Sequence, residues 1–292
     1  MLGYYKYERK LSKVGEPFFA LKAGQDGHEI LHLLWAEGLT PSEAIDQVMT
    51  PTDSGLFSQE SDDITPTQML ELMEAYVKGV MNGPYRPVTL TPGMIDFSKL
   101  AYPTEAEVTE ALNANGQLSE LGVACNWDGL IEPYGGIIDR LMQHQDTGHY
   151  EVWDTKFTSS PLTEYLGARW EGSYQMIGYA ALWRELTGLN INAGKVEAIY
   201  IGSAKSYRFG QTRYYPVFDG WNDEMQDDLT AWVNDRIREI QWRQVNNVWT
   251  QVDGSWPSWR QSVCKRCDFR DLCFSRPSAR KGLIERDYEE RE

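Results

Sequence analysis

Two apolar runs interrupted by acidic residues constrain the fold of this chain more than any other feature. The run "GGIIDRLM" carries Asp139, and the run "YEVWDTKF" carries Asp154 and Lys156. Side chains alternate between the two faces of a β-strand, so Asp154 and Lys156 share one face. The short polar segment "QHQDTGH" can join the two runs as a hairpin, which would place Asp139 beside Asp154.

Two carboxylates held together repel each other unless a proton or a cation lies between them. Hard divalent cations prefer such oxygen ligands. Lys156, on the same face as Asp154, could orient a water molecule or offset charge on a phosphate. The alternative is a hairpin with a structural Asp–Lys pair on a solvated surface, because the tripeptide Asp-x-Lys is common.

Periodicity elsewhere predicts an α/β fold with a mixed central sheet flanked by helices. Helices are expected over 27–39, 67–81, 104–112, 171–186 and 222–243, and strands over 122–131, 135–142, 150–157, 195–202 and 212–219. Thr104 and Glu107 have the spacing of a capping box. The polar stretch from Thr50 to Thr67 is expected to be a loop or an exposed linker.

The charge balance is acidic, with a net charge of −15 over 292 residues. This argues against indiscriminate binding of polyanions, but it leaves room for a local basic groove. The charge reverses between Arg260 and Lys281, where the alternative is a solvated basic surface. No apolar stretch approaches the ~18 residues of a membrane span, and the N-terminus lacks the apolar block of a signal peptide. We therefore expect a soluble cytoplasmic protein, bacterial or phage-encoded, with no membrane partner.

Three of the four cysteines, Cys264, Cys267 and Cys273, lie within ten residues as "CKRCDFRDLC". In a cytosolic chain such clustering favours a metal site over disulfides. Zinc and iron–sulfur both remain open at this point, since C-x2-C begins many zinc sites. The fourth cysteine, Cys125, lies on a predicted strand.

The order of Asp139 and then Asp154–Lys156 resembles the core of the PD-(D/E)XK nuclease superfamily. The segment "QMIGY" holds Gln175 and Tyr179 at the Q-x-x-x-Y spacing of the RecB-like branch of that superfamily. Residues four apart share one face of a helix. The alternative is an ordinary, partly buried helix face.

Two further segments extend the resemblance to the RecB-like branch. "AGQDGHEIL" resembles its G-x-x-x-H motif, with Gly24 and His28, and the cysteine-rich segment resembles the C-x2-C-x5-C tail of its iron–sulfur members. These members include the CRISPR-associated exonuclease and the nuclease domains of helicase–nucleases. The matches follow the order of the family along the chain.

The resemblance implies a restriction-endonuclease-like core and a site for Mg2+ or Mn2+. The implied metal ligands are His28, Asp139, Asp154 and the backbone carbonyl of Thr155, and the implied catalytic residues are Asp139, Asp154, Lys156, Gln175 and Tyr179. An imidazole among carboxylates shifts the preference toward Mn2+. Gln175 and Tyr179 would support Lys156 or the DNA backbone.

The resemblance also implies a 4Fe–4S cluster held by Cys264, Cys267 and Cys273, for which a fourth thiolate is required. In the family the first cysteine precedes an aromatic-rich segment such as the one that begins at Tyr4. The missing cysteine would then fall at or just before Met1, so we expect a truncated sequence or an alternative start. Cys125 is a weak candidate for the fourth ligand.

We expect a single nuclease domain over 1–292, with a helical insertion at 38–100 and a basic, cysteine-rich segment at 256–281. Candidate DNA contacts are Lys205, Arg208 and Arg213 in a hairpin loop, and Arg260, Lys265 and Arg266 near the C-terminus. The expected function is exonuclease activity on single-stranded or end-bearing DNA in recombination, repair, phage or CRISPR systems. Helicase, recombination or CRISPR proteins are candidate partners. The alternatives are a non-catalytic DNA-binding or scaffold module with a relic site, and an unrelated metal-binding structural protein.

Overall fold

A computed structural model of the chain describes residues 11–13, 19–49, 65–116, 122–201, 208–246, 285 and 288–290. The chain divides into two compact units, Phe18–Asp235 and Met1–Pro17 with Arg236–Glu292. Within the latter unit, β1 (Leu11–Lys13) pairs antiparallel with β10 (Tyr288–Glu290). The five-stranded and three-stranded sheets lie in the unit Phe18–Asp235.

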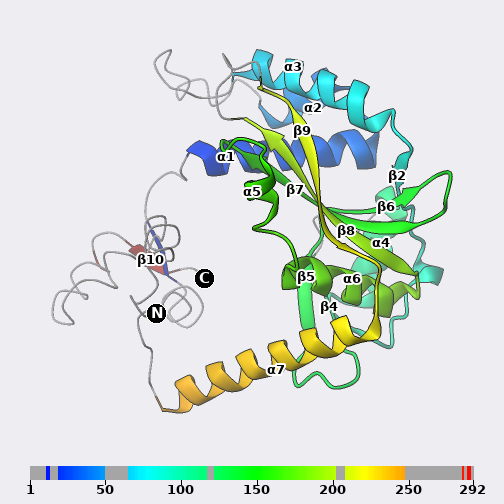
Figure 1. Ribbon diagram of the computed structural model, residues 1–292, viewed down its shortest axis with the longest axis vertical. Coiled ribbons are helices and arrows are strands. Elements are labelled where there is room, and N and C mark those ends of the chain that lie inside the picture. Colours follow the sequence, from blue (N-terminus) through cyan, green and yellow to red (C-terminus); the bar gives the residue numbers. More distant parts are fainter. Residues whose placement is uncertain are drawn as a thin grey trace. The chain divides into compact units, whose positions relative to one another are not determined.

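A five-stranded mixed sheet forms the centre of this unit, in the order β2-β6-β7-β8-β9 (Figure 1). Its strands are β2 (Tyr85–Pro87), β6 (Arg140–His144), β7 (Tyr150–Thr158), β8 (Ile191–Tyr200) and β9 (Thr212–Asp219). β6 and β7 form the predicted antiparallel hairpin, and β7 and β8 run parallel. β2 and β9 pair antiparallel with β6 and β8. The predicted mixed α/β architecture is confirmed.

A second, three-stranded sheet contains β3 (Leu100–Tyr102), β4 (Gly122–Cys125) and β5 (Tyr134–Ile137). The single strand predicted over 135–142 is therefore wrong. It divides into β5 and β6, which belong to different sheets, and Asp139 lies in the break between them. The apolar alternation continues through both strands, so periodicity alone does not reveal the division.

Parallel neighbours in a sheet need a crossover connection, and here α5 (Glu164–Gly167) and α6 (Tyr174–Thr187) lie between β7 and β8. α6 packs against both strands. α4 (Glu105–Asn115) begins with the predicted capping box at Thr104. α7 (Asp223–Val245) is tied to the segment after β4 by a 2.9 Å hydrogen bond from Trp127 Nε1 to Thr230 Oγ1.

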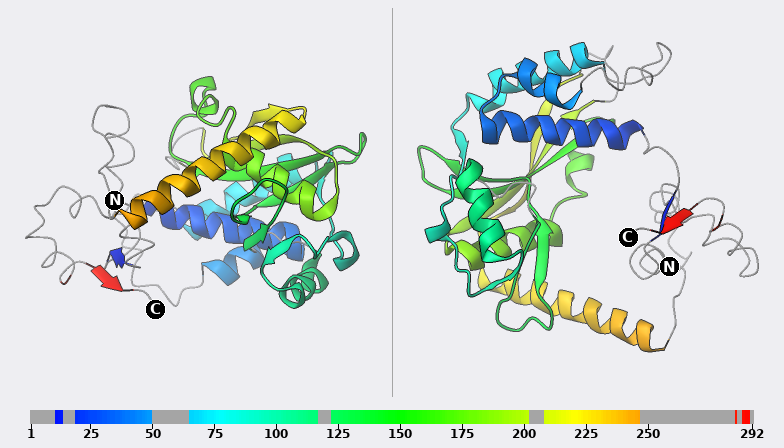
Figure 2. Two further views of the ribbon diagram at one scale, coloured as in Figure 1. Left: turned by 90° about the horizontal axis from the view of Figure 1, so that it is seen from below. Right: turned by 180° about the vertical axis from the view of Figure 1, so that it is seen from behind.

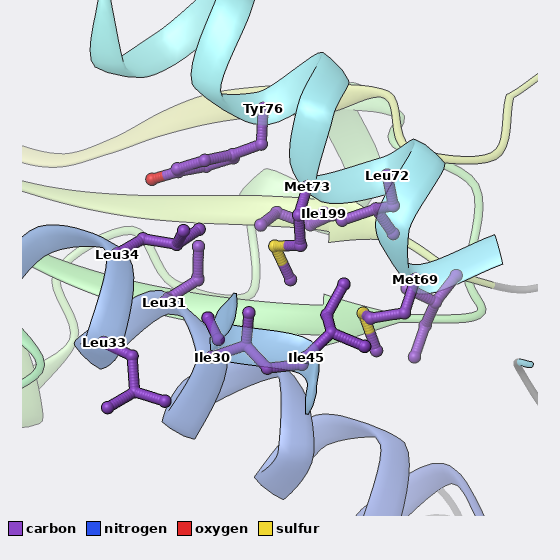
Figure 3. Close-up of a cluster of buried hydrophobic side chains, with 12 residues drawn as sticks. Ile30, Leu31, Leu33, Leu34, Ile45, Met69, Leu72, Met73, Tyr76 and Ile199 are labelled. Carbon is purple, nitrogen blue, oxygen red and sulfur yellow. The ribbon is translucent and has the colours of Figure 1, made fainter. Parts of the chain in front are cut away.

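A helical layer covers one face of the central sheet (Figures 1 and 2). It consists of α1 (Phe19–His32), η2 (Leu33–Glu37), α2 (Pro41–Val48), α3 (Pro66–Tyr76) and η4 (Val77–Met81). Ile30, Met73 and Ile199 are among the fully buried residues where this layer meets β8 (Figure 3). The short turn η5 (Pro92–Met94) follows β2. The boundaries of the insertion at 38–100 stay a prediction.

Among the described residues, no helix combines the length and the apolar character needed to cross a lipid bilayer.

Replacement of Ile30 by alanine should destabilise the helical layer, because its side chain is fully buried between α1 and the sheet. The free energy of unfolding should fall by about 2–5 kcal/mol, as measured by chemical denaturation. Glu29→Ala, an exposed change on the same helix, is the matched control and should alter it by less than about 0.5 kcal/mol. Equal effects of the two substitutions would contradict this packing.

Candidate active site

Asp139 is held at the break between β5 and β6 by the main chain of β7. Its Oδ2 accepts a 2.6 Å hydrogen bond from the amide of Thr155. The preceding Gly136 lets β5 approach α6 closely, since a Cβ at Gly136 would lie 2.5 Å from Cε1 of Tyr179. The hairpin thus brings Asp139 to the middle of β7, as the sequence predicted.

Asp154 and Lys156 form an ion pair on one face of β7, as expected for residues two apart on a strand. Lys156 Nζ lies 2.9 Å from Oδ1 and 2.8 Å from Oδ2 of Asp154. Only 4% of the Asp154 side chain is exposed, against 37% of the Lys156 side chain. The buried carboxylate and the more accessible ammonium therefore form one polar unit that reaches toward solvent.

Burial sets the protonation of this pair. It raises the pKa of Asp154 above its usual value, and the nearby charge of Asp139 adds to this although Lys156 opposes it. Burial alone would lower the pKa of Lys156, but the carboxylates of Asp154 and Asp139 hold it above its usual value. Lys156 is accordingly a cation at neutral pH.

His28 approaches the same point from α1. Its Nδ1 lies 3.5 Å from Oδ2 of Asp139, and its ring meets Phe157 edge-on at 5.5 Å between centroids. Burial lowers the pKa of His28, and Lys156 and Arg140 add to this, although Asp139 and Asp154 act in the opposite direction. The imidazole is therefore neutral at pH 7, which is the form that binds metals.

The glycine that shapes this contact is Gly27, which the sequence motif did not single out. A Cβ at Gly27 would lie 2.5 Å from the ring of Phe157, whereas one at Gly24 would meet no described atom within 4 Å. The close approach of α1 to β7 therefore depends on the residue directly before His28. In the sequence, the only signal for Gly27 was its position directly before His28.

Gln175 and Tyr179 touch across one turn of α6, as their spacing predicted. Gln175 Nε2 donates a 2.8 Å hydrogen bond to the hydroxyl of Tyr179. Burial raises the pKa of Tyr179, and the hydrogen bond from Gln175 opposes this. Asp154, Lys156 and Asp139 also act on that pKa, so α6 presents this pair to the site.

A cluster of buried polar residues lies on the face of β7 opposite the side chains of Asp154 and Lys156. The sequence analysis did not identify it. We name it the Glu197 cluster, and its members are Glu197, Arg140, Thr155, Tyr76 and Tyr214. Glu197, which is fully buried, pairs with Arg140 and accepts hydrogen bonds from all three hydroxyls. Arg140 also donates to Thr155 and Tyr76. Neither Arg140 nor Glu197 stood out in the sequence, because a single charged residue within a predicted strand gives no sign that it will be buried.

The donor chemistry of His28, Asp139 and Asp154 fits a divalent cation such as Mg2+ or Mn2+. In this conformation, however, Lys156 bonds both oxygens of Asp154. No three His, Cys, Asp or Glu side chains of the described residues converge closely enough to hold a metal ion.

Other predicted residues lie elsewhere. Arg213 is on β9 rather than in a hairpin loop, where it pairs with Glu164, donates to the Leu162 carbonyl at 3.0 Å and lies over the Tyr215 ring. Arg208 lies in the turn before β9. Lys205, Arg260, Lys265, Arg266 and the three clustered cysteines lie outside the described residues.

Cys125 is fully buried on β4, with its sulfur 3.9 Å from the Leu182 carbonyl. Burial raises the pKa of its thiol to about 12, so the thiol stays protonated at neutral pH. In this environment Cys125 behaves as a small apolar residue.

The geometry has a counterpart in a known family. The family model described as the PD-(D/E)XK nuclease superfamily matches residues 4–274. The chain belongs to this superfamily. PD-(D/E)XK proteins are generally metal-dependent nucleases, which implies DNA as the substrate, and the mixed sheet agrees with their restriction-endonuclease-like fold. No match was found among curated proteins.

Replacement of Asp154 by asparagine should stabilise this PD-(D/E)XK protein in the absence of divalent metal. A carboxyl whose pKa is raised in the folded state favours folding when protonated and opposes it when ionised, so its removal should raise the melting temperature at pH 7. The gain should shrink as the pH falls toward 3.8, the ordinary value for aspartate. Thermal melts in EDTA at both pH values measure this.

Asp96→Asn is the matched control, because hydrogen bonds from Ser98 lower the pKa of Asp96. This substitution should lower the melting temperature at pH 7 or leave it unchanged. If Asp154→Asn also lowered the melting temperature, Asp154 would be a net stabilising charge and the electrostatic account would be wrong.

Proposed function

We propose that this PD-(D/E)XK protein is a metal-dependent deoxyribonuclease of the RecB-like branch, acting as an exonuclease on single-stranded or end-bearing DNA. The observation that carries the proposal is the meeting of Asp139, Asp154 and Lys156 around β7, with His28 beside Asp139. The hydrogen-bonded pair of Gln175 and Tyr179 supports the choice of branch. The preference for strand ends rests on the resemblance of the motifs.

Hydrolysis of a phosphodiester needs an oriented water molecule and stabilisation of the charge that develops on the phosphate oxygens. Bound Mg2+ or Mn2+ would supply Lewis acidity and lower the pKa of a water molecule. Asp139, Asp154, neutral His28 and the carbonyl of Thr155 would hold the ion. Lys156, whose raised pKa keeps it charged, would hold the attacking water and stabilise the phosphate.

Asp154 has a second role in this scheme, since its hydrogen bonds aim the ammonium of Lys156. Gln175 is exposed at the start of α6, where its amide can contact the DNA backbone. Tyr179 is buried beneath it and fixes its orientation. These two residues would therefore position substrate and lysine.

The second candidate is a non-catalytic DNA-binding or scaffold module that keeps a relic of this site. The raised pKa of Asp154 argues against it, because a carboxyl whose pKa is raised by folding opposes folding at neutral pH, and a relic has no reason to keep that cost. Cleavage in the presence of Mn2+ distinguishes the two.

We also propose that Cys264, Cys267 and Cys273 bind a 4Fe–4S cluster, with zinc as the alternative metal. Their C-x2-C-x5-C spacing supports the cluster, and the burial of Cys125 makes that residue a poor fourth ligand. The proposal also includes DNA contacts by the basic residues near Arg208 and Arg260. The proposed partners are helicase, recombination or CRISPR proteins, and the proposed location is the cytoplasm.

Asp154→Ala and Lys156→Ala should each abolish Mn2+-dependent cleavage of end-labelled single-stranded DNA. The first removes a metal ligand and the second removes the cation that stabilises the transition state, so the rate should fall at least about 100-fold. EDTA should abolish cleavage by the unaltered protein. Lys195→Ala serves as the control, because Lys195 pairs with Glu151 away from the site.

Circular dichroism establishes that each variant is folded. Cleavage at the unaltered rate by a folded Asp154→Ala or Lys156→Ala variant would refute the assignment of the site. Absence of cleavage by the unaltered protein on any DNA end would favour the non-catalytic module.

Anaerobically purified protein should contain iron and acid-labile sulfide, and Cys264→Ser should lose both because it removes one thiolate of the cluster. Cys125→Ala is the matched control and should retain the iron, since its thiol is buried against Leu182. Stoichiometric zinc without iron would refute the cluster, and loss of iron from Cys125→Ala would make Cys125 a ligand.

A further inference from the structure

We infer that the Glu197 cluster positions Thr155 for the proposed metal site around Asp139 and Asp154, and that the Thr155 hydroxyl is the contact through which it acts. This inference rests on the proposed nuclease function. It assigns a positioning role to Arg140, Glu197 and the side chain of Thr155.

Thr155 links the cluster to Asp139. Its amide donates to Asp139 at 2.6 Å, while its hydroxyl accepts from Arg140 and donates to Glu197 at 3.0 Å. Both side-chain partners lie on neighbouring strands, Arg140 on β6 and Glu197 on β8. A movement of the Thr155 side chain would therefore move the amide that holds Asp139.

The strand register shows which main-chain hydrogen bond is replaced by the bond from the Thr155 amide to Asp139. Arg140 is the first residue of β6 that pairs with β7, opposite Trp153. If β6 continued backward, Ile138 would lie opposite Thr155, and its carbonyl would receive the Thr155 amide. The carboxylate of Asp139 takes that place. The Asp139 side chain thus accepts the hydrogen bond that a main-chain carbonyl would accept in a regular antiparallel ladder.

In an extended strand the N–H and C=O of one residue point to the same side. The carbonyl of Thr155, a proposed metal ligand, therefore points toward Asp139 as its amide does. If the cluster fixes the Thr155 side chain, it also fixes the direction of both groups.

Stability alone is a poor explanation for the cluster. Glu197 is fully buried and only 5% of the Arg140 side chain is exposed, so both ions lose their hydration. Replacing such pairs by apolar residues is often neutral or stabilising. Here the pair is supplemented by hydroxyls from α3 and β9, since Tyr76 and Tyr214 both donate to Glu197. The cluster fixes the position of the Glu197 carboxylate, because both of its oxygens accept hydrogen bonds.

The test compares Thr155→Val, which keeps the shape but removes the hydroxyl, with Thr155→Ser, which keeps the hydroxyl. Thr155→Val should lower Mn2+ affinity, measured by calorimetry, and kcat for DNA cleavage by about 10- to 100-fold. KM for DNA should change little. Thr155→Ser should retain several times more of both properties than Thr155→Val. Thr212→Val, on β9 outside the cluster, should behave as the unaltered protein.

Hydrogen exchange in the metal-free protein gives a readout independent of activity. The amide at position 155 should exchange faster in Thr155→Val than in Thr155→Ser, while the melting temperatures stay within a few degrees. Tyr214→Phe, which removes one donor to Glu197 at a partly exposed position, should cause a smaller change in the same direction.

Equal Mn2+ affinity, kcat and amide exchange in Thr155→Val and the unaltered protein would overturn the inference. So would equal losses in Thr155→Val and Thr155→Ser. If the unaltered protein cleaves DNA and Asp154→Ala does not, either result refutes the positioning role alone. If the unaltered protein neither binds Mn2+ nor cleaves DNA, both the inference and the proposed function are refuted.

Discussion

The hydrogen bond from the Thr155 amide to Asp139 joins the beginning of β6 to the middle of β7, and the geometry of the site depends on it. Without it, Asp139 would be an acid in a short break between two strands, with nothing to direct it toward Asp154. With it, the carboxylate lies where His28 can approach from α1. The helical layer, the hairpin and the crossover helix all contribute groups to the surroundings of this one contact.

The central sheet buries the charged side chains of Arg140, Glu151, Asp154 and Glu197. Trp153 lies between two cations, with Arg140 and Lys195 each 6.0 Å from its ring centre. Lys195 pairs with Glu151 at 2.6 Å and donates to Tyr85 at 2.9 Å. Because each ion has a carboxylate, hydroxyl or aromatic partner, the sheet can hold these charges without leaving one unpaired. Polar contacts of defined direction thus fix the relative positions of β6, β7 and β8.

Local pattern in the sequence was enough to predict the elements that bear the site. Alternation placed Asp154 and Lys156 on one face of a strand, and helical spacing placed Gln175 beside Tyr179. The division of 135–142 between two sheets was missed. An apolar run has the same sequence pattern whether it forms one strand or two strands of different sheets. Arg140 and Glu197 were missed for a related reason. A buried ion pair arises from residues 57 positions apart, and nothing local marks either partner.

The location of Asp139 between two sheets has a consequence for how such a site can diversify. β5 carries the residues that directly precede Asp139, and it packs on α6 through Gly136 against Tyr179 and through Tyr134 against Gly178. Substitutions along the three-stranded sheet can therefore shift one acid relative to the other while every residue of the central sheet stays the same. Variation in metal preference or turnover among related chains could then accumulate at positions that never touch metal or DNA.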